Sequence, residues 1–302
     1  MKKSIPGTEN VVMEIRDMQI FLAVANEGSI TRAAEKLEYV QSSISIRIQQ
    51  LENELHTVLF IRQRQGVQLT TSGQIFKSYA EKILALTQEA VQVVSDRSTP
   101  QGPLRIGCLE TTAAIRLPNI LADYHPSYPE VDLTLKTGTT DELTKLVLKF
   151  ELDGAFVAGP VEHEELETTV IGYEELVIVS GGQHLSVEQM EELQHQTLLV
   201  FRIGCSYRQK YEDWLNAKGL RPAKIMEFGT VDGILGCVHA GLGISLLPRS
   251  VVERANAHYK LHIHQLTESA FNTETLFIRR KDSYVTPAVS ELIRIATEKF
   301  NG

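Results

Sequence analysis

The sequence predicts a multidomain α+β protein with three successive parts. Two short helical patterns joined by a tight turn and followed by a basic hairpin predict a winged helix-turn-helix over residues 13–71. Apolar residues at alternating steps of three and four predict one long helix over residues 72–97. Buried-strand patterns that alternate with helical patterns predict a two-lobed α/β domain over residues 104–302.

The two short helices form the predicted DNA-reading element. The Ser29 hydroxyl can cap the first helix, which should end near Leu37. The Ala33-Ala34 pair leaves room for a second helix to cross it closely. The second helix should begin near Ser42 and turn one apolar side inward. That side consists of Ile44, Ile48, Leu51 and Leu55.

Polar side chains remain on the outside of this element. In a helix-turn-helix, the second helix enters the major groove with its N-terminus first, where free amides suit phosphate and Gln or Ser side chains meet base edges. The predicted contacts to double-stranded DNA are Thr31, Arg32, Gln41, Ser42, Ser43, Ser45, Arg47, Arg62 and Arg64.

The charge of the chain limits this interaction. The net charge is −8, and residues 13–70 contain six basic against seven acidic side chains. The positive surface must therefore be local, so one copy should bind DNA weakly. Two copies on two half-sites would compensate for this weakness.

The long helix predicts how two copies meet. Its apolar residues follow the spacing of a two-helix coiled coil, which we call the seam. The seam consists of Phe76, Tyr79, Ile83, Leu86, Ala90 and Val93. The alternative is a helix that packs on its own domain. We favour the coiled coil because no compact partner precedes this helix in the chain.

A hinge over residues 98–103, which contains two prolines and a glycine, separates the long helix from the α/β domain. Beyond it, the order of strands and helices predicts right-handed crossovers and a mostly parallel sheet. The last helix, over residues 286–300, should pack back on the first lobe. The expected strands are 104–108, 131–136, 154–158, 176–180, 198–201, 224–228, 241–248 and 275–280, and the other expected helices are 113–124, 140–151, 207–218 and 231–240. Lobe I should comprise residues 104–160 and 268–302, and lobe II residues 161–267.

Hydroxyl groups and helix N-termini gather at the loops after several strands. In sheets of this kind, ligands bind outside the carboxyl ends of the strands, and hydroxyls beside helix N-termini favour a small anion. The alternative is that the threonines merely cap their helices, which should hold for about half of them. The residues predicted to bind this small molecule are Leu109, Glu110, Thr111, Thr112, Thr139, Thr140, Gly204, Cys205, Ser206, Arg208 and Thr230.

The chain resembles the LysR-type transcriptional regulators. The resemblance spans residues 14–73 and continues through the α/β domain. It rests on Phe21-Leu-Ala-Val-Ala, Gly28-Ser29, Ala33-Ala34, Gln41, Leu51-Glu52, Leu59-Phe60, Arg62 and Leu69-Thr70-Thr71-Ser72-Gly73. It implies a DNA-binding domain, subunits paired through the linker helix, and a periplasmic-binding-protein-like effector domain. It also implies effector contacts at Thr111, Thr112, Thr140 and Ser206.

Local differences separate this chain from the usual family pattern. His56 stands where a glycine usually ends the recognition helix, so the helix must end on a less favourable left-handed residue or fray. Ile46 replaces a frequent arginine, and Arg64 comes one place early. The segment 204–208, with 227–230, resembles the branch that includes Gram-positive regulators of glutamate-synthase type.

Other classes of protein are less compatible with the sequence. It contains no Gly-x-Ser-x-Gly, His-Glu-x-x-His or phosphate-loop motif, so we expect no enzyme, cofactor or metal site. Two alternatives stay open. One is a DNA-binding scaffold without a ligand, and the other is a thiol-based redox sensor through Cys205, near a helix start that would favour thiolate. The second lacks a resolving cysteine a few residues downstream.

The remaining expectations concern location and partners. Residues 1–12 should form a disordered extension, and three unpaired cysteines fit a reducing cytoplasm. No apolar run approaches the ~20 residues of a membrane span. We expect a homodimer that assembles into a homotetramer on DNA and responds to a small-molecule effector. RNA polymerase is a further candidate partner.

Overall fold

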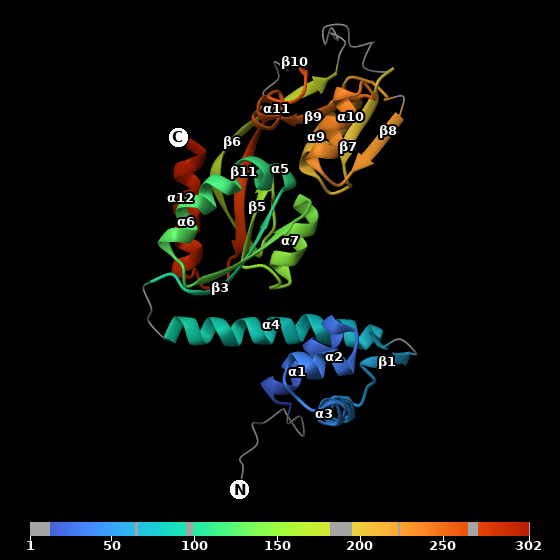
Figure 1. Cartoon of the computed structure of the whole chain (residues 1–302), viewed down its shortest axis with the longest axis vertical. Coiled ribbons are helices and arrows are strands. Elements are labelled where there is room, and N and C mark those ends of the chain that lie inside the picture. The colour runs from blue at the N-terminus through green and yellow to red at the C-terminus, as the bar shows by residue number, and fades with distance from the viewer. Residues whose placement is uncertain are drawn as a thin grey trace. The chain divides into compact units, whose positions relative to one another are not determined.

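The computed structural model describes residues 13–63, 66–94, 99–181, 195–222, 224–264 and 271–301. It consists of two compact units, unit 1 and unit 2, which divide between Ser95 and Asp96 (Figure 1). The predicted extension over residues 1–12, the predicted DNA contact Arg64 and the start of the predicted hinge lie outside the described residues.

Unit 1 contains the predicted winged helix-turn-helix. Its helices are α1 (Ile15–Glu27), α2 (Ile30–Lys36) and α3 (Gln41–Glu54), and its wing is the antiparallel pair β1 (Phe60–Gln63) and β2 (Gly66–Leu69). The Ser29 side chain accepts a hydrogen bond from the Arg32 amide at 3.4 Å, which confirms the predicted cap. Beyond α3, His56 adopts a left-handed conformation with φ of 49°, as the missing glycine predicts.

Some apolar residues of the long helix α4 (Thr71–Val94) pack within unit 1, and others are exposed. Ala80 is fully buried, and the Phe76 ring meets the Phe21 ring of α1 edge to face at 4.8 Å. Ile83 also packs against this core. Four seam residues remain exposed, so part of the predicted seam packs within unit 1 and part stays available to a partner. The exposed ones are Tyr79, Leu86, Ala90 and Val93.

Unit 2 contains two lobes, each built around parallel strands. In lobe I, β3 (Gly102–Cys108) pairs in parallel with both β4 (Val131–Thr137) and β5 (Gly154–Ala158). In lobe II, β7 (Thr197–Phe201) pairs in parallel with β8 (Lys224–Phe228) and β9 (Ile244–Pro248). Side chains of α6 and α12 form one core with lobe I, so the last helix packs where the sequence predicts.

Helices connect these strands. Lobe I has α5 (Glu110–Ile115), α6 (Leu117–Ser127), α7 (Thr140–Leu148) and the C-terminal α12 (Pro287–Asn301). Lobe II has α9 (Ser206–Ala217), α10 (Val231–His239), α11 (Arg249–Ala255) and the short strand β10 (His262–His264). Among the described helices, none has an apolar stretch long enough to cross a lipid bilayer.

Two long strands join the lobes. β6 (Leu166–Ser180) pairs with β11 (Asn272–Arg280) over residues 166–175 and with β9 over residues 176–180, always antiparallel. The boundary between the lobes therefore falls within β6, beside Glu175, rather than near residue 161 as predicted. The first half of β6 was missed because its charged and polar residues conceal the strand pattern, whereas residues 176–179 form an apolar run.

Ion pairs hold both lobes at this crossing. Glu174 is buried and accepts hydrogen bonds from Arg116, between α5 and α6, at 2.9 Å and from Ser250 of α11 at 3.1 Å. The adjacent Glu175 meets Arg249 through two hydrogen bonds, at 2.6 and 2.9 Å. These bonds from Arg249 hold the pKa of the Glu175 carboxyl below its ordinary value of 4.5.

We predict that the Glu175–Arg249 pair contributes a pH-dependent stability. A lowered carboxyl pKa stabilises the folded chain above the unfolded value, and this contribution is lost as the pH falls from about 4.5 through the lowered folded pKa. Because the pair is partly exposed, Glu175→Gln should cost about 1 kcal/mol or less at neutral pH.

Thermal unfolding of the wild type and of Glu175→Gln, measured from about pH 7 to about pH 3, tests this. The difference between their midpoints should shrink toward acid. A difference that stays constant over this range would contradict the role of the ionised pair.

Candidate functional site

The predicted DNA contacts lie on the outside of unit 1. Thr31, Arg32, Gln41, Ser42 and Ser43 are exposed on α2 and at the start of α3, and Ser45 is half-buried. Arg62 is exposed on the wing strand β1, opposite Val67. The guanidinium of Arg32 donates a hydrogen bond to the Glu27 carbonyl oxygen at the end of α1.

Arg47 is not free in this unit. Its guanidinium lies 3.2 Å from the Asp17 carboxylate and 4.0 Å from the Glu14 carboxylate. Asp17 is itself buried, so this contact ties α3 to the start of α1. The recognition helix therefore offers DNA fewer free positive charges than the sequence alone suggests.

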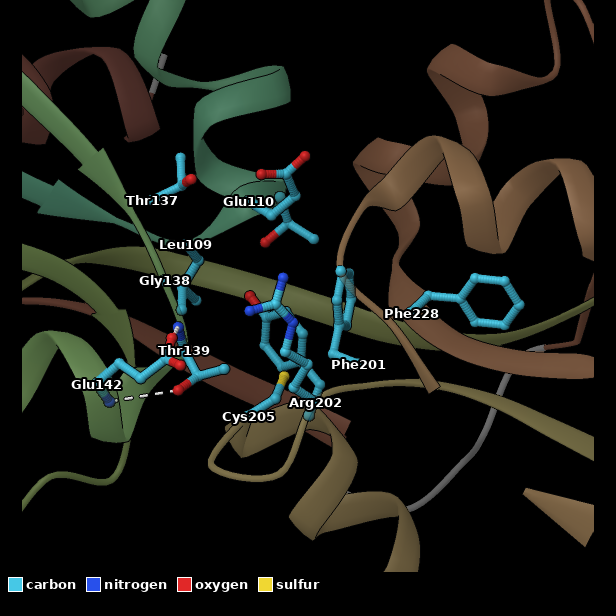
Figure 2. Close-up of a pocket in the computed structure, with 13 residues that line it drawn as sticks. Leu109, Glu110, Thr137, Gly138, Thr139, Glu142, Phe201, Arg202, Cys205 and Phe228 are labelled. Carbon is cyan, nitrogen blue, oxygen red and sulfur yellow. Dashed lines mark hydrogen bonds between the residues drawn. The ribbon is translucent and has the colours of Figure 1, made fainter. Parts of the chain in front are cut away.

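Unit 2 contains a cleft between its two lobes, where loops at the carboxyl ends of β3, β4, β7 and β8 approach one another (Figure 2). The empty volume of the cleft is about 540 Å³, part of which is open to solvent. A volume of this size suits a small ligand. The cleft is lined by Leu109, Glu110, Thr111, Thr137, Gly138, Thr139, Glu142, Phe201, Arg202, Cys205, Tyr207, Phe228 and Gly229. Five of these were predicted, namely Leu109, Glu110, Thr111, Thr139 and Cys205.

Thr111 has an unsatisfied hydroxyl in this cleft. Thr111 is 4% exposed, and its Oγ1 has no hydrogen-bond partner of ordinary geometry among the described residues. Burial raises the pKa of the nearby Tyr207 hydroxyl, and its contact with the Thr111 side chain opposes this rise. A buried hydroxyl without a partner costs free energy, so a ligand that bonds to it would recover that cost.

Arg202 is a cleft residue that the predicted set omitted. It follows directly after β7, and its side chain extends into the cleft from lobe II (Figure 2). Its guanidinium packs over Gly229, where an added Cβ would lie 2.6 Å from a guanidinium nitrogen. The available signal was its place at the carboxyl end of a buried strand, where ligands of such folds bind.

Two carboxylates also line the cleft, with different roles. Glu142 accepts a hydrogen bond from the Thr139 amide at 3.0 Å and so completes the cap at the start of α7. Glu110 stands at the start of α5 on the lobe I side (Figure 2). Within the described chain, neither Glu110 nor Arg202 has a side-chain ion pair or hydrogen bond. The cleft therefore presents one uncommitted negative and one uncommitted positive charge.

Hydrogen bonds close one side of this cleft and connect the lobes. The Ser206 hydroxyl lies 3.0 Å from both the Thr140 hydroxyl and the Ala158 carbonyl oxygen. Because a hydroxyl has one proton, Ser206 can donate to Ala158 while it accepts from Thr140. The Asp141 amide also donates to the Gly204 carbonyl oxygen at 3.2 Å. We call these contacts the lobe latch.

Gly204 is required in the latch. Its φ of +91° is a conformation that other residues rarely adopt, and an added Cβ would lie 3.0 Å from the Thr139 hydroxyl. Thr140, Gly204 and Ser206 line a second hollow rather than the cleft with Thr111, while Cys205 borders both.

Three other predicted effector residues serve the fold. Thr112 is buried but does not line the cleft. Arg208 pairs with Glu212 at 2.8 Å and with Glu227 at 2.7 Å. Thr230 caps α10 by accepting from the Gly233 amide, which is the alternative that the sequence left open for such threonines. Their contact with an effector stays a prediction without support from this geometry.

The two buried cysteines, Cys108 and Cys205, are poorly suited to redox chemistry. Burial raises the pKa of Cys205, although the amides of Tyr207 and Arg208 oppose this shift. Burial raises the pKa of Cys108 to about 12. A raised pKa removes the thiolate, which is the reactive form. The structure thus disfavours the Cys205 sensor. Within the described residues, no group of three or more His, Cys, Asp or Glu side chains could hold a metal ion.

Comparison with known proteins covers both units. Residues 15–74 match the bacterial regulatory helix-turn-helix protein domain of the lysR family, and residues 97–301 match the LysR substrate binding domain. The transcriptional regulator GltR of Bacillus subtilis is 47% identical over 95% of this chain and 97% of its own length. The regulator CzcR of Bacillus thuringiensis is 44% identical over 96% of each chain.

Solved structures share the fold. Full-length CbnR in complex with its target DNA has a TM-score of 0.67 at 23% identity, and covers 95% of this chain and 100% of its own. A cysteine-to-aspartate variant of full-length OxyR from Pseudomonas aeruginosa has a TM-score of 0.73 at 21% identity, and covers 96% of this chain and 95% of its own.

We predict that Cys205 and Cys108 react slowly in the folded chain. Iodoacetamide should label the half-buried Cys237 first, because burial keeps the other two as protonated thiols. Peptide mass spectrometry of native and urea-unfolded protein measures the order of labelling. Rapid labelling of Cys205 in the native state would contradict this prediction and support a redox sensor that acts through Cys205.

Proposed function

Because the chain belongs to the LysR family of DNA-binding transcriptional regulators, we propose that it regulates promoters in the bacterial cytoplasm under the control of a small anionic effector. The effector would bind between the lobes of unit 2, in the cleft lined by Thr111 and Arg202. Members of this family are not enzymes, and the function rests on binding alone.

One observation carries the choice of an anion: an uncommitted guanidinium and a buried, unpartnered hydroxyl share a cleft. Arg202 offers a fork of donors that matches a carboxylate, and its charge is not neutralised by a side-chain partner among the described residues. Thr111 can donate one further hydrogen bond. Apolar walls from Leu109, Phe201 and Phe228 would surround the rest of a small organic acid.

Glu110 limits the kind of acid. A ligand with one carboxylate can place it at Arg202, away from Glu110. A second carboxylate at the opposite end would meet the Glu110 carboxylate, and like charges at short range repel. We therefore expect monocarboxylates to bind better than dicarboxylates of equal length.

The latch suggests how binding could change the shape of unit 2. Thr139 lines the cleft, and the next residue, Thr140, hydrogen-bonds Ser206 of the opposite lobe. A ligand can shift the angle between lobes only if it binds one arrangement better than the other. Contacts to lobe I through Thr111 and to lobe II through Arg202 would supply that difference.

We further propose that the regulator acts as a homodimer, and as a homotetramer on DNA. The exposed seam residues Tyr79, Leu86, Ala90 and Val93 form an apolar row on α4 that a second α4 would cover. Two copies would also double the weak positive surface of one DNA-binding unit. RNA polymerase remains a candidate partner of the bound assembly. The alternative is a DNA-binding scaffold that responds to no ligand.

We predict that Arg202→Gln abolishes stabilisation by the effector. Small monocarboxylates are screened by thermal shift of the full chain, since a ligand stabilises it by RT ln(1 + [L]/Kd). For an acid that raises the midpoint, Thr111→Val should weaken binding about tenfold, the value of one net hydrogen bond. Arg221→Gln, which removes an exposed arginine outside the cleft lining, is the matched control.

Two outcomes would contradict this assignment. If all three variants respond as the wild type does, the acid binds elsewhere. If no small acid changes the thermal midpoint, or the length of promoter DNA that the protein protects from nuclease, the alternative of a DNA-binding scaffold gains support.

We predict that Leu86→Asp combined with Val93→Asp splits the dimer. Both residues are exposed on the seam, whereas Ile83 packs inside unit 1 and would report on folding instead. Buried carboxylates in a coiled coil would lose packing and charge hydration together. Sedimentation velocity should show a monomer. The control, Val91→Asp, changes an exposed valine outside the seam and should leave a dimer. A dimer that survives the double change would place pairing elsewhere.

A further inference from the structure

The side of α3 that faces away from the core has an exposed isoleucine at its centre. Successive residues of a helix are about 100° apart, so this side lies opposite the buried Ile44, Ile48 and Leu51. We call it the outer face, and it consists of Ser42, Ile46, Gln49, Gln50 and Asn53, all of them exposed. Ile46 keeps 56% of its surface accessible. Figure 1 shows α3 nearly along its axis, so this face runs along the viewing direction.

The outer face contains no charged side chain. Arg47, the nearest cation on the helix, is held by Asp17 at 3.2 Å. Phosphate groups are bound mainly by cations and by amides at helix ends, whereas base edges are read by neutral polar and apolar groups. The residues at the centre of this face are therefore suited to contact base edges rather than the phosphate backbone of DNA.

We infer that Ile46 determines sequence specificity by packing against the 5-methyl group of a thymine in the major groove. Thymine presents the apolar group that an isoleucine can contact there, while guanine, adenine and cytosine present donors and acceptors. The occupant of this face is double-stranded DNA, because α3 is the second helix of the helix-turn-helix in a family of DNA-binding regulators.

A single exposed isoleucine is ordinary on most protein surfaces. At the centre of a groove-reading face it has a consequence, because insertion of α3 removes water from Ile46 and from the base edge beneath it. A polar edge at that place would lose hydrogen bonds to water without replacement, whereas a thymine methyl would gain contact. Gln49 and Gln50, on the next turn, can bond adenine edges beside it. The inference concerns DNA reading and does not depend on the proposed effector.

The test combines one substitution in the protein with one atom group in the DNA. A binding site is first selected from random duplexes with the full wild-type chain. Each thymine in that site is then replaced by deoxyuridine, which removes only the methyl group. Dissociation constants are measured at one fixed salt concentration for the wild type and Ile46→Ala.

At one thymine position per half-site, replacement by deoxyuridine should weaken DNA binding by the wild type about fourfold. This factor corresponds to about 0.8 kcal/mol for one buried methyl group. Ile46→Ala should bind the thymine site more weakly than the wild type and should show no penalty for deoxyuridine at that position. Ile46→Val, which keeps a branched side chain, should retain part of the penalty.

Ile15→Ala is the matched control, because Ile15 is an isoleucine of the same unit, 44% exposed, on a different helix. It should keep the full deoxyuridine penalty. Circular dichroism and the thermal midpoint of Ile46→Ala should match the wild type, since alanine favours a helix and Ile46 lies outside the core.

Two results would overturn the inference. One is a deoxyuridine penalty of equal size in the wild type and Ile46→Ala. The other is a selected site in which no thymine responds to loss of its methyl group.

Discussion

The continuity of β6 through both lobes is the constraint on which the rest of unit 2 depends. One strand pairs with β11 in lobe I and with β9 in lobe II, so neither lobe can move without twisting the strand between them. Buried Glu174 and the adjacent Glu175 fix the crossing through arginines and a serine from both sides. Consecutive residues Thr275 and Leu276 of β11 pair with Gly172 and Val170, so Ile171 is an extra residue on β6, and such a bulge bends and twists its strand locally. The lobes thus have a stiff connection at one edge and the hydrogen-bonded latch at the loops, with the cleft beside that latch.

Charge is used sparingly in unit 1, and this shapes how it can bind DNA. The ion pair between Arg47 and Asp17 orients α3 against α1 but withdraws a cation from the DNA-facing surface. The outer face of α3 is neutral, so backbone attraction must come from exposed cations such as Arg32 and Arg62 and from helix ends. Because the outer face is neutral, it contributes little binding free energy on DNA of random sequence. Such a composition favours discrimination among sequences over tight general binding, and it makes pairing of subunits important for affinity.

Much of the fold could be predicted from the sequence because local patterns and local structure agree there. The helix-turn-helix follows from the Ser29 cap and the apolar side of α3, and residues 104–108, 154–158 and 176–180 lie in strands because their apolar runs are buried. The first half of β6 escaped because partners, rather than its own pattern, make it a strand. The seam was predicted from spacing alone, but spacing does not tell whether Phe76 faces a partner or Phe21.

The site was less predictable, because loops place side chains through contacts that are remote in sequence. Hydroxyl residues near helix starts could be found, yet the sequence could not separate Thr111, whose hydroxyl lacks a partner, from Thr230, which caps its own helix. Thr140 and Ser206 satisfy each other across the lobes, a pairing over 66 positions that no local pattern reveals. The position of the Arg202 side chain depends on the absence of a Cβ atom at Gly229, which follows a different strand. Those remote contacts also give the cleft its chemical character. In the cleft, the Thr111 hydroxyl and the Arg202 guanidinium are hydrogen-bond donors that the fold leaves without a side-chain partner of ordinary geometry among the described residues, so they have free energy still to gain from a ligand.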